Sequence, residues 1–117
     1  MSHERALLGS LLIDPEAIGR VRGLVGVDDF AGPKGRAIYA AMLALHDQGE
    51  PTDYVLVEAE LDRRGDLGKV VRASDVIELA LHCPTSVYAE QYARRVREAA
   101  DKRRAAARPP QGGALAL

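Results

Sequence analysis

The sequence contains no tryptophan, one phenylalanine and one cysteine. A single cysteine excludes an internal disulfide framework and is typical of proteins in a reducing compartment. Because large aromatic residues are scarce, the core has to be built from Leu, Val, Ile and Ala. No apolar run approaches the ~18 residues that cross a bilayer, and the N-terminus lacks the basic head and cleavage site of an export signal. We therefore expect a soluble, intracellular protein of the cytoplasm without a membrane partner.

A strong charge of either sign is also missing, since the net charge of the 117 residues is −1. The length predicts one domain with a modest core, too small for a two-lobed enzyme. An apolar content of 47% and a charged content of 28% are typical of globular chains. The overall charge argues neither for nor against a nucleic-acid partner, so the placement of charge matters more.

Apolar residues recur at helical spacing, and no segment shows the sustained alternation of a strand. The sequence therefore predicts an all-α fold: a compact bundle of about six helices, of which the last is long and basic. The first helix should end at Asp14 and Pro15, and Pro15 suits the first position of a second helix with Asp14 as its N-cap. The apolar positions of the first three helices are Leu7, Leu8, Leu11, Leu12, Ile18, Val21, Val25, Ile38, Ala41, Met42 and Leu45.

Short connectors separate the later helices. Phe30 is the only large apolar residue between positions 26 and 35, and we expect it to plug the core. Gly49 should end the third helix, and Pro51 prevents its continuation. Asp53 can accept hydrogen bonds from the first amides of the fourth helix, which should stop at Gly65. The joint is thus expected to fix the angle between two helices.

The last two helices are predicted from position 74 onward. Ser74 or Asp75 can cap the fifth, which ends before Pro84, and the sixth begins at about Ser86. Residues 1–108 should form the domain, and residues 109–117, which contain Pro and Gly, a flexible tail. The sixth helix carries a packing stripe made of Tyr88, Tyr92, Val96 and Ala99.

Motifs that carry chemistry are weak throughout. The sequence lacks the phosphate-binding loop G-x-x-x-x-G-K-[ST], which excludes nucleotide hydrolysis by that route. The stretch "GPKGR" at 32–36 is better interpreted as a connector than as a phosphate cradle, because no strand is predicted before it. His82 and Cys83 lie at spacings unrelated to the other histidines, which argues against a metal site. We expect no catalytic residue, cofactor or metal. Two pairs of acids are interpreted as caps and solvated faces and not as catalysts: Asp28 with Asp29, and Glu58 with Glu60.

The sixth helix concentrates positive charge, with seven basic against three acidic residues between positions 90 and 108. Basic residues near a helix C-terminus complement the helix dipole, which accounts for part of the pattern. A contact with nucleic acid or with an acidic partner is the alternative, although aromatic residues are not interleaved with the late arginines. The residues for such a contact are Arg97, Lys102, Arg103, Arg104 and Arg108.

Four pieces of the sequence, in this order and spacing, resemble one known family. They are "LLGSLLIDPEAI" at 7–18, "DDF" followed by Pro33, Arg36 and Ile38, "ALHDQGEPTD" at 44–53, and "YARRVREAADKRR" at 92–104. Over roughly residues 4–104 the chain resembles the N-terminal domain of the DnaB-type replicative DNA helicases. The first and third pieces are the most specific.

The resemblance implies an all-helical head that has no ATPase activity and serves as a docking and ring-organising collar. In that family a compact bundle is followed by a long helical hairpin through which neighbouring subunits pair, and the primase contacts the collar. The partners implied are a second copy, primase or another replisome protein, and a helicase motor domain if the chain is a fragment; contact with DNA would be indirect. The alternative function is a small nucleic-acid-binding protein. The expected contact residues are Tyr88, Tyr92, Arg95, Val96 and Ala99.

The chain also departs from the family pattern. Ala31 and Gly35 replace a frequent aromatic residue and a histidine, so the connector should pack more loosely. Arg95 and Lys102 stand where apolar residues are frequent on the first arm of the hairpin. We expect either an excised fragment or a stand-alone head, because the sequence given stops soon after two prolines, before the second arm.

Overall fold

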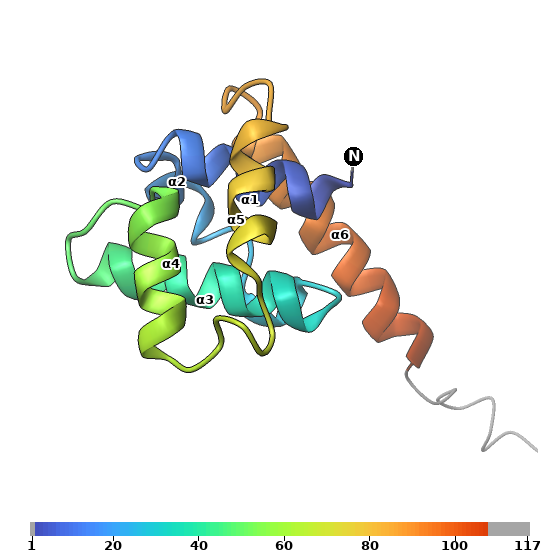
Figure 1. Cartoon of the computed structure of the whole chain (residues 1–117). Coiled ribbons are helices and arrows are strands. Elements are labelled where there is room, and N and C mark those ends of the chain that lie inside the picture. The colour runs from blue at the N-terminus through green and yellow to red at the C-terminus, as the bar shows by residue number, and fades with distance from the viewer. Residues whose placement is uncertain (1, 108–117) are drawn as a thin grey trace, which may run out of the picture.

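A computed structural model describes residues 2–107, and within them the fold is all-α (Figure 1). One isolated bridge between Leu67 and Val71 is the only β-type pairing found in this part of the chain. The predicted tail at 109–117 and the predicted contact residue Arg108 lie outside the described residues. The elements are α1 His3–Ile13, α2 Ala17–Val21, the 3₁₀ helix η1 Val27–Asp29, α3 Pro33–Asp47, α4 Tyr54–Arg63, α5 Ala73–Leu81 and α6 Ala89–Ala107.

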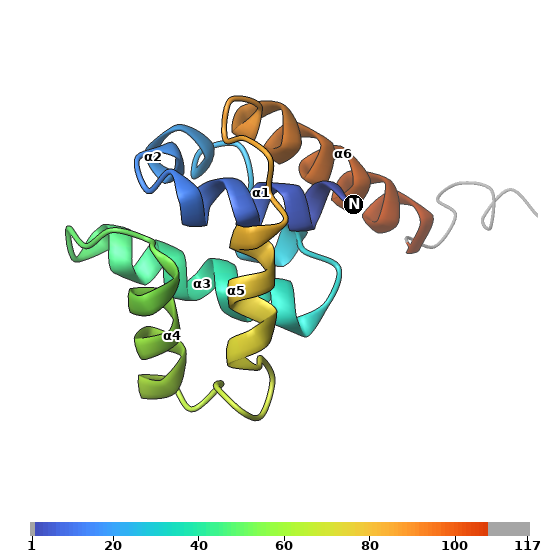
Figure 2. The same cartoon turned by 45° about the horizontal axis from the view of Figure 1, so that its top comes forward.

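Helix α1 is the centre of the domain. It lies between α6 on one side and α3 and α5 on the other (Figure 2). Its residues from Ala6 to Leu12 are all buried, so the helix is covered on nearly every side. A helix surrounded in this way has to be apolar all round, which explains the continuous run of Leu, Gly, Ser and Ala.

The crossing of α1 and α5 depends on Gly9. A Cβ atom at this position would lie 2.5 Å from the carbonyl oxygen of Leu79 and 2.7 Å from Cβ of Cys83. Neither atom belongs to the end of a flexible side chain, so only glycine allows the two helices to approach this closely. The hydroxyl of Ser10 turns back onto the carbonyl of Ala6 at 2.7 Å, which satisfies it inside the core.

The start of the second helix was predicted wrongly. Helix α2 begins at Ala17, and Pro15 lies in the turn that precedes it. The amide of Asp14 still bonds to the carbonyl of Ser10 as the last bond of α1, and the Asp14 side chain lies near Arg20 and Ser86 instead of capping α2. Asp14 is thus used to close one helix, which leaves the next without a side-chain cap.

Phe30 plugs the core as predicted, and its ring centroid lies 4.9 Å from that of Tyr39 on α3. Both side chains are fully buried. The Tyr39 hydroxyl donates a hydrogen bond of 2.9 Å to the carbonyl of Val25, and burial raises the pKa of Tyr39 to about 12. The chain between α2 and α3 is therefore held to the core by its one phenylalanine and by this tyrosine.

The joint between α3 and α4 is also as predicted. Gly49 has a φ of +76°, a conformation that favours glycine, and Asp53 accepts a hydrogen bond of 2.8 Å from the Leu56 amide. The joint is further fixed by Thr52, whose buried hydroxyl donates a 2.6 Å hydrogen bond to the carbonyl of Leu11. This bond ties the start of α4 to the centre of the domain.

Helix α5 begins earlier than expected, at Ala73, with Arg72 in the N-cap position. The prediction of Ser74 or Asp75 as the cap is therefore wrong. Asp75 is the third helical residue, and its carboxylate accepts a 2.9 Å hydrogen bond from the Arg72 amide. This is the reciprocal half of a capping box, which a sequence pattern places only to within a turn. Over residues 2–107, no helix is long and apolar enough to cross a membrane.

Candidate protein-docking face

Helix α6 and the turn before it present two adjacent rows of residues, one buried and one facing outward. The buried row consists of Ala89, Ala93, Val96 and Ala100, in which three of the four side chains are alanines. Such small side chains let α6 lie close to α1, its main neighbour. Val96, one of the predicted contact residues, is 2% exposed and belongs to this intramolecular row.

We call the second row the outer seam, and it contains the other four predicted contact residues. The sixth helix was predicted to begin at about Ser86, which is wrong: α6 begins at Ala89, and Tyr88 lies in the turn just before it. Tyr88 is half exposed, Tyr92 packs partly against the core, and Arg95 and Ala99 are exposed. The rings of Tyr88 and Tyr92 meet edge to face with centroids 6.4 Å apart, and the Tyr92 ring lies 6.5 Å from that of His3 at the start of α1. The outer seam consists of Tyr88, Tyr92, Arg95, Ala99 and Lys102.

A hollow accompanies the outer seam where α6 passes the start of α1. It has a volume of about 200 Å³ and is lined by His3, Arg95, Glu98, Ala99 and Lys102. The only ion pair among these lining residues joins Arg95 to Glu98 at 3.5 Å. Charged side chains therefore make up most of the lining, and Tyr92 lies beside the hollow through its contact with the His3 ring.

The late arginines of α6 contact the 3₁₀ helix η1. Arg103 donates to the carbonyl of Asp29 at 2.8 Å, and Arg104 donates to the carboxylate of Asp29 at 2.6 Å and to the carbonyl of Asp28 at 3.2 Å. Arg97 pairs instead with Asp101 on its own helix at 3.1 Å. Two of the residues predicted for a nucleic-acid contact are thus engaged within the domain.

Asp29 is the acceptor at the centre of this contact, and its side chain is buried. Burial disfavours the charged carboxylate, but the 2.7 Å hydrogen bond from the Gly26 amide and the ion pair with Arg104 outweigh that effect. The net result is that the pKa of Asp29 is lowered. The interpretation of this acid as a cap is confirmed, because it binds the amide three residues before it.

Glu60, His82 and Cys83 are the other acidic or metal-ligating residues considered from the sequence. Glu60 is buried and pairs with Arg63 at 2.7 Å, and this hydrogen bond, together with the nearby Arg64, lowers the pKa of Glu60. Cys83 is buried beside the Ser10 hydroxyl, whereas His82 is exposed. The residues from 2 to 107 contain no group of three His, Cys, Asp or Glu that could hold a metal ion.

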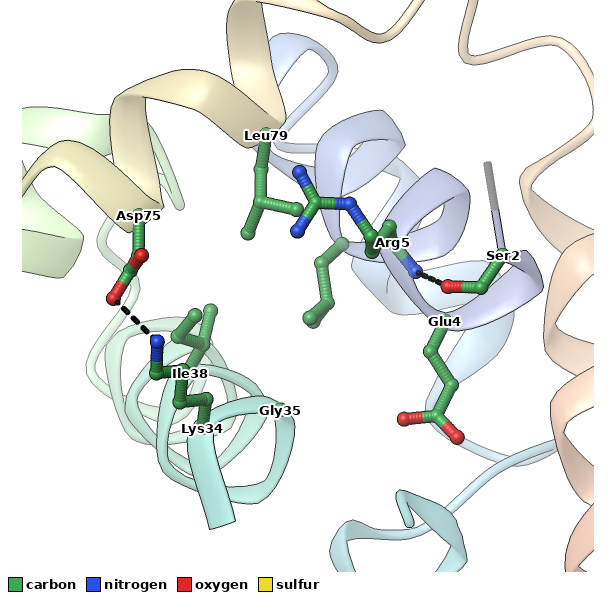
Figure 3. A pocket seen from close by; sticks show the side chains of 9 residues that line it. Ser2, Glu4, Arg5, Lys34, Gly35, Ile38, Asp75 and Leu79 are labelled. Atoms are coloured by element: carbon green, nitrogen blue, oxygen red, sulfur yellow. Dashed lines mark hydrogen bonds and ion pairs between the residues drawn. The ribbon is translucent and has the colours of Figure 1, made fainter. Parts of the chain in front are cut away.

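A second hollow, of about 150 Å³, was not anticipated from the sequence (Figure 3). It opens where the first turns of α1, α3 and α5 meet, and it includes Lys34 and Gly35 of the stretch "GPKGR". Its lining comes from three segments far apart in the chain, so no local pattern could have indicated it. The lining residues are Ser2, Glu4, Arg5, Leu8, Lys34, Gly35, Ile38, Asp75 and Leu79.

The structure defines an all-helical domain whose long last helix leaves one row of residues at the surface. The sequence places it more narrowly. Residues 1–98 match the model of the DnaB-like helicase N terminal domain family, and the chain belongs to this family. The predicted resemblance is thereby confirmed.

Two relatives show the extent of the similarity. The chain is 38% identical over 104 residues to the replicative DNA helicase DnaB of Mycobacterium leprae. The aligned region covers 89% of this chain and 17% of that relative. It is also 38% identical over 101 residues to the replicative DNA helicase DnaB of Geobacillus stearothermophilus. That alignment covers 86% of this chain and 22% of the relative. The chain thus spans less than a quarter of the length of either relative.

Solved structures share the fold. A crystal structure of the N-terminal domain of DnaB helicase from Mycobacterium tuberculosis superimposes with a TM-score of 0.85 at 38% identity, covering 89% of this chain and 75% of that one. A DnaB-like replicative helicase, described together with its interactions with primase, gives a TM-score of 0.75 at 28% identity. The match covers 89% of this chain and 24% of that helicase.

Proposed function

We propose that this domain is a non-catalytic interaction and oligomerisation module of the DNA replication machinery, acting in the cytoplasm. The observation that carries the proposal is the outer seam of α6 in a chain that belongs to the DnaB N-terminal family. Its partners are a second copy of the domain and primase or another replisome protein, and a helicase motor domain completes the assembly.

The outer seam has the pattern of a helix-pairing surface. Its residues Tyr88, Tyr92, Arg95, Ala99 and Lys102 alternate in spacings of four and three, which is the repeat that keeps one face of a helix against a partner helix. The two tyrosines supply large, rigid contact area, and such side chains dominate the energy of protein interfaces. Val96 supports the seam from beneath, because it anchors α6 in the core.

A second copy is the first occupant we assign to the outer seam. The seam carries the cations Arg95 and Lys102 beside Glu98, so antiparallel pairing of two seams can place acids opposite bases. Primase is the second partner of the module. This assignment is supported by the similarity to a DnaB-like helicase whose structure is described with its interactions with primase.

We also propose that the domain itself does not turn over ATP. The relatives are named replicative DNA helicases, but the chain spans less than a quarter of their length. The 117 residues include no G-x-x-x-x-G-K-[ST] loop, the element that cradles nucleotide phosphates in many motors. Binding and positioning, rather than chemistry, are therefore the roles assigned to these helices.

The alternative of direct nucleic-acid binding has less support. Arg103 and Arg104 already donate to η1, and Arg97 is paired with Asp101. A phosphate would have to replace these internal acceptors, which weakens the electrostatic gain that drives such binding.

Static light scattering of the pure chain, with and without a primase C-terminal domain, tests the proposed function. We expect the mass to rise with protein concentration, and a mixed complex to form when the primase domain is added. A chain that stays monomeric and binds no primase domain would contradict the proposal. ATP turnover by a clean preparation would contradict its non-catalytic part.

A further inference from the structure

The hollow between α1, α3 and α5 has an apolar floor. Leu8, Ile38 and Leu79 lie at its base and are each less than 5% exposed. Its volume is about 150 Å³. An apolar cavity of about that size accommodates a benzene molecule, so the hollow has room for one aromatic or leucine side chain.

Four charged residues lie on the rim of the hollow, and three of them have a hydrogen-bond or ion-pair partner within the domain. Lys34 reaches across to Asp75, with 3.2 Å between the ammonium and the carboxylate (Figure 3). The single N–H of Ala31 is shared between the two carboxylate oxygens of Glu4, at 3.2 Å from each. The guanidinium of Arg5, in contrast, is directed toward Leu79 at the edge of the hollow (Figure 3), and it makes no ion pair with any residue between 2 and 107.

We infer that this hollow binds a short acidic peptide segment of a partner protein, with one aromatic or leucine side chain on the apolar floor and a neighbouring carboxylate on Arg5. The charge complementarity rests on Arg5, because the other three charged groups of the rim already have partners within the domain. Guanidinium and carboxylate match in geometry as well as charge, and such pairs are among the stronger polar contacts.

A nucleic-acid occupant fits the hollow less well. Bases are held without sequence preference mainly by stacking on aromatic rings, and none of the lining residues is aromatic. A peptide can place a single carboxylate at Arg5 and keep the rest of its backbone uncharged.

This inference rests on the proposed function, since it adds a second docking surface and states the chemistry of its partner. The two surfaces lie on different elements: the outer seam is on α6 and the turn before it, whereas the hollow is formed by α1, α3 and α5. Failure of one can therefore be told from failure of the other, because self-association reports on the outer seam and peptide binding reports on the hollow.

The test uses two blocked pentapeptides, each with a central phenylalanine, flanked by aspartates in one and by lysines in the other. Each is titrated into the ¹⁵N-labelled full chain while amide chemical shifts are followed. We expect the acidic peptide to shift the amides of Arg5, Lys34 and Gly35 in a saturable way. Its affinity should be at least about tenfold higher than that of the basic peptide, since a charge-assisted hydrogen bond contributes on the order of one such factor.

The variant Arg5→Glu reverses the charge that carries the inference. A glutamate at the third position of α1, opposite the N-cap Ser2, is favourable for a helix N-terminus, so the fold is retained. We expect the acidic peptide to bind this variant at least about tenfold more weakly. The matched control is Lys69→Glu, which makes the same charge change in the loop before α5, outside the hollow, and should bind as the wild type does.

Three results would each overturn the inference. They are the absence of saturable shifts at the hollow, equal affinity for the acidic and basic peptides, and unchanged binding by a folded Arg5→Glu variant. If the hollow fails while the chain still self-associates, the proposed function stands without it. If the hollow binds the acidic peptide while the chain stays monomeric and ignores the primase domain, the proposed function fails instead.

Discussion

The guanidinium of Arg104, near the end of α6, lies 2.6 Å from the carboxylate of Asp29, a residue 75 positions earlier in the chain. The same carboxylate caps η1 through the Gly26 amide at 2.7 Å. One buried acid therefore fixes the loop before α3 and holds the projecting end of α6 against the domain. This link joins the last turns of α6 to η1, in addition to the packing of α6 against α1.

Replacing Asp29 by alanine should lower the free energy of unfolding by about 1–2 kcal/mol, because a buried cap is lost and the Gly26 amide is left without its acceptor. Arg104 is half exposed, so water compensates for part of its loss. Urea denaturation measures the change. The control Asp28→Ala removes a neighbouring exposed carboxylate and should stay within about 0.5 kcal/mol of the wild type. Equal stability of the two variants would contradict the role of Asp29.

Acid should destabilise the domain partly through Asp29. A carboxyl whose pKa is lower in the folded than in the unfolded chain adds stability above its unfolded pKa of about 4. That stability is lost as the pH falls through the folded pKa. We expect the unfolding free energy to fall between about pH 5 and pH 2, and to fall less steeply in Asp29→Asn. The unfolding free energy is measured by urea denaturation at several pH values. If it depends on pH equally in the wild type and in Asp29→Asn, the pKa of Asp29 is not lowered by folding.

The crossing of α1 and α5 predicts a strong effect of a single methyl group. Gly9→Ala should destabilise the domain by about 1–3 kcal/mol, because the new Cβ atom meets the Leu79 carbonyl and forces the helices apart. Gly19→Ala is the matched control, since its nearest neighbour is a His46 ring atom at 3.9 Å. That substitution should be neutral or stabilising by up to about 1 kcal/mol. Thermal unfolding followed by circular dichroism distinguishes the two, and a stable Gly9→Ala variant would refute the close crossing.

Substitution by serine should change the free energy of unfolding differently in the two rows of α6. Val96→Ser, in the buried row, should cost about 1–3 kcal/mol of stability, because an apolar side chain is replaced by a hydroxyl inside the core. Ala99→Ser, in the outer seam, should change stability by less than about 0.5 kcal/mol. Urea denaturation at low protein concentration keeps association out of the measurement. Similar losses for both variants would mean that the rows are assigned wrongly.

Much of the fold follows from the sequence because local signals dominate it. Helical periodicity, the glycine at 49 and the cap at Asp53 are short-range features, and each of them was predicted. The errors concern helix starts, where several polar residues compete for one role. The Asp14 amide makes the last hydrogen bond of α1, and Asp75 is the third residue of α5. Neither residue therefore occupies the N-cap position that was predicted for it.

The candidate sites are less predictable because tertiary contacts decide them. The spacing of α6 fits both rows, and only the packing of alanines against α1 shows which row is buried. The basic cluster gives no indication that Arg103 and Arg104 bind η1, because their acceptors lie 74 to 76 residues away. The hollow at Arg5 arises from three helix starts that no sequence pattern relates to one another.

The central claim is that the outer seam pairs with a second helix, and sedimentation velocity over a range of concentrations tests it most directly. The seam variant is Tyr88→Ser with Tyr92→Ser, and the control is Tyr54→Ser with Val55→Ser, which removes exposed apolar side chains from α4. We predict that the sedimentation coefficients of the wild type and control rise with concentration, whereas the seam variant remains monomeric. Association of the seam variant equal to that of the wild type, or a wild type that is monomeric throughout, would contradict the account.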